Sequence, residues 1–233
     1  MQNIEVNISE IFYSIQGEGL LAGRPSVFIR LAGCPLRCKY CDTEYALDSK
    51  AGTKMPIDEI MKKALKHSPD YAVITGGEPL ISQQITLLCE TVKKQNIHTT
   101  IETAGIKFVP NLACDLMSIS PKLSNAHNNE PDKAGYLKID QIAELIKNYD
   151  YQLKFVMEKI EDITEVHQVL NDLKLVLDRD RGDFDRSKIL LMPQAKNISQ
   201  YLKISPLIVE LCKANGFVFS PRLQLYNPDP DKK

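Results

Sequence analysis

Residues 26–41 read SVFIRLAGCPLRCKYC and decide how the rest of the chain is interpreted. The first eight residues are mostly apolar and include β-branched side chains, which predicts a buried strand. Three cysteines, Cys34, Cys38 and Cys41, follow at once with the spacing C-x3-C-x2-C. Five further short apolar runs resemble this strand, and they span residues 71–75, 98–103, 115–120, 152–157 and 188–193.

Longer amphipathic segments alternate with these runs. Strands that alternate with helices predict an α/β fold built from parallel βαβ units. A complete eightfold barrel usually needs about 250 residues. A chain of 233 residues with six such units therefore predicts an incomplete (β/α)6-type TIM barrel, formed by a single domain over residues 1–233. The expected helices span residues 56–67, 82–96, 138–149, 161–173 and 199–215, and Pro206 is expected to interrupt the last of them.

The composition excludes several classes of protein. Hydrophobic residues make up 43% of the chain and charged residues 25%, which excludes disorder as its main state. The 29 Lys and Arg residues are balanced by 30 Asp and Glu residues, so we expect no nucleic-acid partner. No apolar run approaches the roughly 18 residues that a membrane span needs, and residues 1–12 do not resemble a signal peptide. We therefore expect a cytoplasmic protein with no membrane partner.

The cysteine group after the first strand indicates a metal centre. Cys34, Cys38 and Cys41 lie within eight residues, with no fourth cysteine or histidine nearby. A structural zinc site needs four protein ligands, and a [4Fe-4S] cluster is normally held by four thiolates. Three thiolates would leave one iron open to a small molecule. A zinc site completed by a distant histidine and simple packing cysteines remain as alternatives; we expect Cys89, Cys114 and Cys212 to be buried core residues.

The cysteine spacing is similar to the signature of the radical S-adenosylmethionine (SAM) superfamily. Residues 75–79, TGGEP, follow the second apolar run and resemble the superfamily's GGEP element. The resemblance implies a [4Fe-4S] cluster whose open iron binds the methionine moiety of SAM. It also implies that an electron from a donor such as flavodoxin or ferredoxin cleaves SAM to a 5′-deoxyadenosyl radical.

The N-terminal segment resembles one family of this superfamily more narrowly. FYSIQGEG (12–19), GRPSVFIR (23–30), LAGC (31–34) and CDT (41–43) occur in the order found in the 7-carboxy-7-deazaguanine synthases. That family rearranges a pterin, 6-carboxy-5,6,7,8-tetrahydropterin, to 7-carboxy-7-deazaguanine with loss of ammonia, in queuosine biosynthesis for tRNA modification. The resemblance also implies a homodimer.

The same resemblance implies roles for individual residues. Thr43 matches the family's Mg²⁺ ligand, with Asp42 as a supporting group, and residues 102–105 resemble an element whose role is less defined. The matching substrate contacts are Ile15, Gln16, Gly17, Glu18, Arg30 and Thr75, and the matching SAM contacts are Gly77, Glu78, Ser120, Lys122 and Gln194.

Each of these positions also has a plain structural interpretation. QGEG is by itself typical of a surface turn, Arg30 of a salt bridge, and Thr43 of a helix cap or turn. The C-terminal tail, from about residue 221, departs from the family pattern, and its closure over the substrate is left open.

Two other functions remain as alternatives. A glycyl-radical activating enzyme, which acts on a partner protein, would share the cysteine spacing and the GGEP element. It would not account for QGEG, Arg30 and the Cys-Asp-Thr sequence together. An iron–sulfur electron carrier would normally need four cysteines for each cluster and would not need GGEP.

Overall fold

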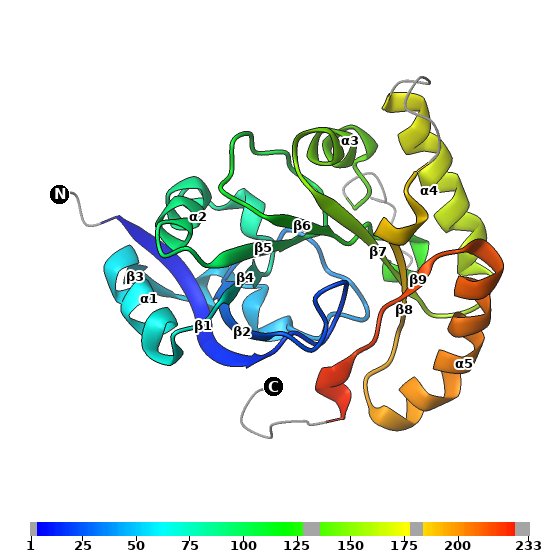
Figure 1. The fold of residues 1–233 in the computed structure, drawn as a ribbon, viewed down its shortest axis with the longest axis horizontal. Helices are drawn as coiled ribbons and strands as arrows, with labels where there is room; N and C mark the ends of the chain where they lie inside the picture. Colours follow the sequence, from blue (N-terminus) through cyan, green and yellow to red (C-terminus); the bar gives the residue numbers. More distant parts are fainter. Residues whose placement is uncertain (1–3, 128–135, 178–183, 227–233) are drawn as a thin grey trace.

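The computed structural model describes residues 4–127, 136–177 and 184–226. All strands in these ranges belong to one nine-stranded sheet with the order β3-β1-β2-β4-β5-β6-β7-β8-β9. β1 pairs antiparallel with both β2 and β3, whereas every pair from β2 to β9 is parallel. β3 and β9 are edge strands, so the curved sheet is open (Figure 1). The strands are β1 (Glu5–Ile15), β2 (Pro25–Leu31), β3 (Thr53–Pro56), β4 (Tyr71–Gly76), β5 (His98–Thr103), β6 (Leu116–Ile119), β7 (Tyr151–Met157), β8 (Ile189–Pro193) and β9 (Val218–Phe219).

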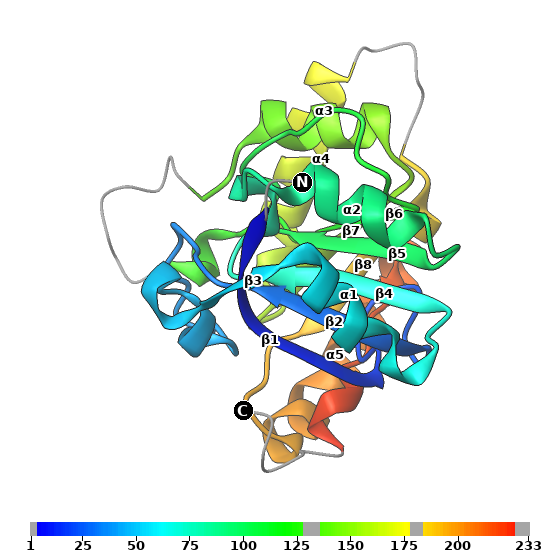
Figure 2. The ribbon, with the colours of Figure 1, turned by 90° about the vertical axis from the view of Figure 1, so that its left-hand side faces the viewer.

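The described ranges contain five α-helices. They pack around the outside of the curved sheet, as Figures 1 and 2 show from two sides. Their amphipathic faces supply the core between helices and strands, where Leu88, Ile142 and Leu173 are fully buried. Within the described residues, no helix is long and apolar enough to cross a bilayer. The helices are α1 (Ile57–Ala64), α2 (Ile85–Lys93), α3 (Ile139–Asn148), α4 (Asp162–Val176) and α5 (Ile198–Asn215).

The pleat of the parallel strands separates two environments. Successive side chains in a strand point to opposite faces of the sheet. In β7, Leu153 and Phe155 belong to the outer core under the helices, so Gln152 and Lys154 face the inside of the curve. The same alternation turns other polar side chains inward, namely Arg30 in β2, Thr75 in β4, Glu102 in β5 and Ser118 in β6.

The six predicted strands correspond to β2, β4, β5, β6, β7 and β8, and the five predicted helices to α1–α5. The incomplete α/β barrel is therefore confirmed. The sequence analysis missed β1, β3 and β9. In β1 the alternation of apolar and polar side chains is broken by an irregularity in its pairing with β2 between Ile8 and Glu10.

The expectation for Pro206 was wrong, because α5 continues through it. Proline lacks an N–H and so cannot bond to the carbonyl of Leu202 four residues earlier. Leu202 is exposed, so water can satisfy that carbonyl instead. The Ser205 hydroxyl donates to the Tyr201 carbonyl at 2.6 Å and adds a bond in the same turn.

Candidate active site

The loop that carries the three cysteines, residues 34–41, follows the carboxyl end of β2 and is called the cluster loop below. Its three cysteines are free thiols and partly buried. Cys34 and Cys38 lie beside an apolar group that contains Leu36 and Tyr136. Three backbone N–H groups tie the loop to other segments. Cys34 N donates to the Leu47 carbonyl (3.0 Å), Arg37 N to the Tyr136 hydroxyl (3.0 Å) and Lys39 N to the Ala126 carbonyl (3.0 Å).

The donor set consists of three thiols, which fits an iron–sulfur cluster with one iron left to another ligand. Burial raises the pKa of Cys34 to about 11, and the nearby Glu78, Cys38 and Cys41 add to the effect. The three thiols are thus close enough to influence one another. Within the described ranges, however, no three His, Cys, Asp or Glu side chains are close enough together to hold one metal ion. A [4Fe-4S] cluster places each thiolate on a different iron, so it fits these residues without a fourth ligand.

Two glycines bring the second motif against this loop. Gly76 has φ +150°, and a Cβ at either Gly76 or Gly77 would overlap the backbone of β2 or of the residues that follow it. Gly77 N donates to the Leu31 carbonyl (3.0 Å) and Glu78 N to the Gly33 carbonyl (2.9 Å). The GGEP element and the start of the cluster loop are therefore joined backbone to backbone.

Glu78 is buried, and its carboxylate is used within the chain. It accepts from the Thr103 hydroxyl (2.7 Å), Ala104 N (2.8 Å) and Leu80 N (3.1 Å). Burial raises the pKa of Glu78 despite these hydrogen bonds, which act in the opposite direction. The side chain thus ties GGEP to the segment 102–105. Its predicted contact with SAM stays a prediction.

Glu102 is a site residue to which the sequence analysis gave no role. Its Oε1 accepts from Gln16 Nε2 (3.1 Å) and its Oε2 from the Thr75 hydroxyl (3.1 Å). It therefore joins two predicted substrate contacts, one from the β1–β2 loop and one from β4. Ile15, by contrast, is half-exposed at the end of β1.

Glu18 lies in a group of cationic and amide side chains. Oε2 pairs with Lys154 Nζ, while Oε1 accepts from Arg222 Nε (3.2 Å) and Gln224 Nε2 (2.7 Å). Burial alone would raise the pKa of Glu18, but Lys154 and Arg222 outweigh it and hold the value at about 2. The sequence analysis missed Lys154 and Arg222. A lysine inside the apolar run 152–157 was the available signal for Lys154, by the same argument that singled out Arg30.

Arg30 and Thr43 are neighbours. Arg30 Nε pairs with Glu10 Oε1 (2.6 Å), and its Nη1 lies 3.4 Å from the Thr43 hydroxyl oxygen. That hydroxyl donates to Asp42 Oδ1 (3.0 Å). The salt bridge that was one interpretation of Arg30 is present, and it uses one of the five N–H groups of the guanidinium.

The predicted SAM contacts after β6 lie beside the cysteines. Lys122 Nζ donates to the Ser120 hydroxyl (3.0 Å). The Lys122 ammonium also opposes the effect of burial, which raises the pKa of Cys38 and Cys41. Gln194 follows β8, where its N–H donates to the Met157 carbonyl at 2.8 Å. These residues follow the carboxyl ends of β6 and β8, two strands of the same sheet with β7 between them.

The loop of residues 16–24 lies inside the curve of the sheet (Figure 1, dark blue). Leu20 N donates to Gln152 Oε1 on β7 (2.8 Å), and Gly19 N donates to the Ser220 hydroxyl after β9 (2.9 Å). The QGEG sequence is therefore an internal loop rather than a surface turn.

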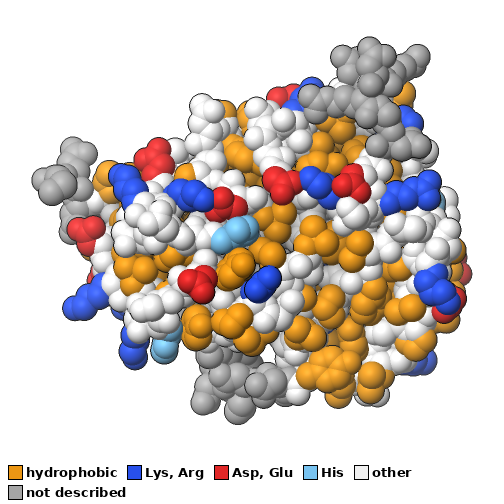
Figure 3. All heavy atoms as spheres, in the orientation of Figure 1, with side chains coloured by type: hydrophobic (Ala, Val, Ile, Leu, Met, Phe, Trp, Pro, Cys, Tyr) orange, Lys and Arg blue, Asp and Glu red, His pale blue; other side chains and the backbone are white. Residues whose placement is uncertain are grey.

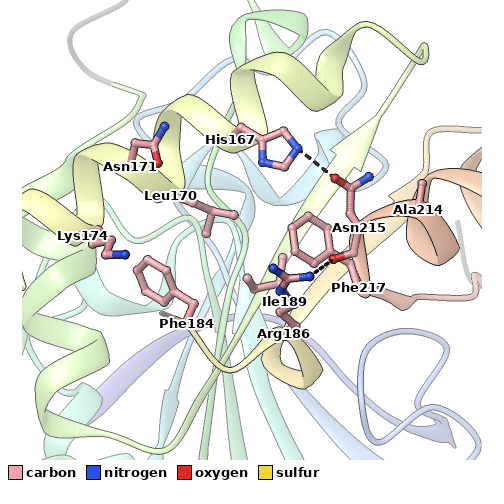
Figure 4. Close-up of a pocket in the computed structure, with 10 residues that line it drawn as sticks. All are labelled: His167, Leu170, Asn171, Lys174, Phe184, Arg186, Ile189, Ala214, Asn215 and Phe217. Carbon is pink, nitrogen blue, oxygen red and sulfur yellow. Dashed lines mark hydrogen bonds between the residues drawn. The ribbon is translucent and has the colours of Figure 1, made fainter. Parts of the chain in front are cut away.

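A separate hollow lies between α4, α5 and the amino end of β8 (Figure 4). It contains none of the predicted site residues. Its polar side chains bond to each other and to the end of α5, with His167 Nε2 2.9 Å from Asn215 Oδ1 and Arg186 Nη1 3.2 Å from the Asn215 carbonyl. The candidate active site is thus confined to the inner face of the sheet and its carboxyl edge.

Comparison with known proteins agrees with this geometry. Residues 28–125 match the family model described as the radical SAM superfamily. A 7-carboxy-7-deazaguanine synthase from Rhodopirellula baltica is 34% identical over 94% of this chain and 84% of its own length. Another, from Pyrobaculum aerophilum, is 35% identical over 94% of this chain and 93% of its own length.

A solved structure supports the fold. QueE from Escherichia coli has a TM-score of 0.69 with this chain, with 24% identity and 93% of each chain covered. The comparisons favour the synthase interpretation over the glycyl-radical activating enzyme. The radical SAM motifs, the open barrel and relatives that align over nearly their whole length lead to one conclusion: the chain belongs to the 7-carboxy-7-deazaguanine synthase family of radical SAM enzymes.

Proposed function

We propose that the chain converts 6-carboxy-5,6,7,8-tetrahydropterin to 7-carboxy-7-deazaguanine with loss of ammonia, as a step in queuosine biosynthesis. The observation that carries this proposal is the set of opposite charges on the inner face of the barrel. The Arg30 guanidinium lies 3.4 Å from Thr43, and Arg30 pairs with Thr75 in the sheet. The Glu18 carboxylate is joined to Asp42, next to Cys41, through Arg222. A substrate with a carboxylate on one ring and a guanidine-like edge on the other offers complementary groups to both.

The cofactor would be held by residues from three loops. Cys34, Cys38 and Cys41 would carry a [4Fe-4S] cluster, which would supply the electron that cleaves SAM. The backbone at Gly77 and the side chains of Ser120 and Lys122 lie beside the cysteines and would bind the methionine part of SAM. Gln194, at the end of β8, would contact its adenosine part.

Substrate orientation would depend on groups whose charge is fixed at neutral pH. With a pKa held at about 2, Glu18 is ionised and can accept N–H groups from the pyrimidine edge. Each carboxylate oxygen accepts more than one hydrogen bond, and Lys154 uses only one position on Oε2. The N–H groups of Arg30 that Glu10 does not use would clamp the substrate carboxylate. Gln16, Gly17 and Thr75 complete this side of the site.

Mg²⁺ would bind at Thr43 together with oxygens of the substrate. The Thr43 hydroxyl donates to Asp42 Oδ1 and accepts a long hydrogen bond from Arg30 Nη1, which leaves one lone pair on its oxygen for a cation. One hydroxyl binds Mg²⁺ weakly, so the ion should bind mainly in the presence of substrate. Turnover should therefore rise when Mg²⁺ replaces a chelator, and Thr43→Val should abolish that rise. Equal turnover of the parent protein under both conditions would contradict a metal at Thr43.

An anaerobic reaction tests the function directly. The protein is reconstituted with iron and sulfide and incubated with SAM, a strong reductant and 6-carboxytetrahydropterin. The product should be lighter than the substrate by one ammonia, and it should be absent when SAM is omitted. Cleavage of SAM with unchanged pterin would show a radical SAM enzyme with a different substrate.

Two partners accompany this function in our proposal. An acidic electron donor such as flavodoxin or ferredoxin suits the exposed cations Arg37 and Lys39 on the cluster loop. A homodimer is supported by exposed apolar side chains, including Leu202, Leu207 and Tyr226, near α5 and the C-terminal segment (Figure 3). Salt should slow reduction by the donor, and sedimentation equilibrium should give twice the chain mass.

A further inference from the structure

The segment after β9 lies along the β1–β2 loop although about 200 residues separate them. Gly19 N donates to the Ser220 hydroxyl (2.9 Å), and Leu223 N donates to the Gly17 carbonyl (3.0 Å). A Cβ at Gly17 would overlap the Gln224 amide, so the two segments are in direct contact. Residues 220–224, named here the C-terminal strap, therefore hold the loop that carries Gln16, Gly17 and Glu18.

Arg222 is the charged residue of this strap, and it is only 7% exposed. Its guanidinium donates to three acceptors from three distant parts of the chain. Nε donates to Glu18 Oε1 (3.2 Å), Nη2 to Asp42 Oδ2 (2.6 Å) and Nη1 to the Ala195 carbonyl. The guanidinium of Arg222 donates from three separate nitrogens, whereas the three N–H groups of a lysine ammonium leave one nitrogen, so lysine cannot span these three acceptors.

The three acceptors each adjoin a different part of the candidate site. Glu18 belongs to the substrate loop, and Ala195 follows the predicted SAM contact Gln194. Asp42 lies between Cys41 and Thr43, and its other oxygen, Oδ1, accepts a hydrogen bond from the Thr43 hydroxyl. One buried side chain thus links the substrate loop, the cluster loop and the end of β8.

We propose that Arg222 is a positioning residue that fixes the substrate loop relative to the cluster loop and so couples SAM cleavage to conversion of the substrate. The proposal rests on the function proposed above. Radical chemistry requires the reacting carbon to lie in contact with the radical, and a misplacement of about 1 Å can cost on the order of a hundredfold in rate. Loss of Arg222 would remove the link between Asp42 and Glu18, although Lys154 and Gln224 would still hold Glu18, so the two sides of the site would be free to shift relative to each other.

The experiment compares three variants in the reconstituted protein. Arg222→Met keeps a long side chain but removes the hydrogen bonds. Arg222→Lys keeps the positive charge but not the planar group that donates from three nitrogens. Arg186→Met is the matched control, because Arg186 bonds to a single backbone carbonyl in the hollow of Figure 4. The measurements are iron content, KM, kcat, the ratio of 5′-deoxyadenosine to product, and amide hydrogen exchange of residues 16–20 and 41–43 before substrate is added.

Arg222→Met should retain its iron, exchange faster in both segments, raise KM at least tenfold and form several 5′-deoxyadenosine molecules for each product. Arg222→Lys should recover the exchange of residues 16–20 but not that of 41–43, and it should remain uncoupled. Arg186→Met should behave as the parent protein in every measurement.

Three results would overturn the proposal. They are an unchanged ratio and KM in Arg222→Met, full recovery of coupling by lysine, or faster exchange confined to residues 220–226. If the parent protein itself forms no product from the pterin, the proposed function fails. The exchange comparison still decides whether Arg222 links the two loops.

Discussion

The two faces of the same sheet are built for different purposes. The outer face and the helices that cover it meet through apolar side chains such as Phe155 on β7, Leu88 on α2 and Ile142 on α3, all fully buried. The inner face buries Lys154 and Arg222, which carry charge. Burial of charge is costly unless each group is paired. The outer face therefore stabilises the fold. The inner face places charged groups at a cost in folding free energy, which is typical of a functional site.

The largest effect is expected from the loss of one of the three cysteines predicted to hold the cluster. Cys34→Ala should abolish the brown chromophore and all SAM cleavage, because two thiolates cannot replace three. Cys212, which is buried in the outer core, provides the control. Cys212→Ala should keep a full complement of iron. Iron analysis and absorbance after anaerobic reconstitution check both variants, and a cluster in Cys34→Ala with normal SAM cleavage would refute the assignment.

Leu88→Ala should instead weaken the apolar packing between the helices and the outer face of the sheet. Leu88 on α2 is fully buried, so its truncation should lower the free energy of unfolding by about 2–5 kcal/mol. The activity of each folded molecule should not change, because the side chain lies on the far side of the sheet from the site. Urea unfolding and turnover normalised to cluster content measure the two effects. A lower kcat in the folded protein would show that the faces are not independent.

Arg30→Met should weaken substrate binding with the cluster retained. A charge-assisted contact to a carboxylate contributes about 1.5–3 kcal/mol, so KM should rise roughly ten- to a hundredfold. Glu10→Gln is the matched variant, because it removes the salt bridge partner of Arg30 and leaves the guanidinium in place. It should change KM much less. A variant of Arg30 with the parental KM would leave only the salt bridge as its role.

The smallest effect concerns the pH dependence of stability. The pKa of Glu18 falls from its ordinary value of 4.5 to about 2 on folding, because Lys154 and Arg222 outweigh the effect of burial. A lowered folded-state pKa stabilises the protein fully above 4.5, and this contribution is lost as the pH falls from 4.5 towards 2. The difference in unfolding free energy between the parent protein and Glu18→Gln should be constant near neutral pH and change across that window. Denaturant midpoints of the cluster-free protein measure it, and a pH-independent difference would mean that folding does not shift the pKa of Glu18.

Most of the fold could be predicted because buried parallel strands are short apolar runs and the helices between them are amphipathic. The face of the sheet toward which each side chain points could not be predicted. In β7 every residue from Gln152 to Met157 is buried, so the sequence does not indicate which face each one occupies. Lys154 was therefore missed, although Arg30 was recognised in a similar strand.

The rest of the site was missed because it depends on contacts between distant segments. Glu102 gains its role only when Gln16 and Thr75 are brought to it from other parts of the sheet. Arg222 lies in the segment where the resemblance to the family is weakest. Its partners Glu18 and Asp42 are known only from the folded chain. Residues 227–233 of the predicted tail lie outside the described residues.

The open sheet has a consequence for self-association. A barrel that does not close has two strand edges, and an unpaired edge can recruit a strand from another chain. Within the described residues these edges are β3, β9 and the part of β1 beyond Ile8, because β3 pairs only with residues 5–8 of β1. Lys54 and Pro56 lie on β3, and both residue types discourage further pairing. The incomplete barrel thus protects its edge at β3, whereas the part of β1 beyond Ile8 keeps a longer unpaired edge on which a strand of another chain can pair.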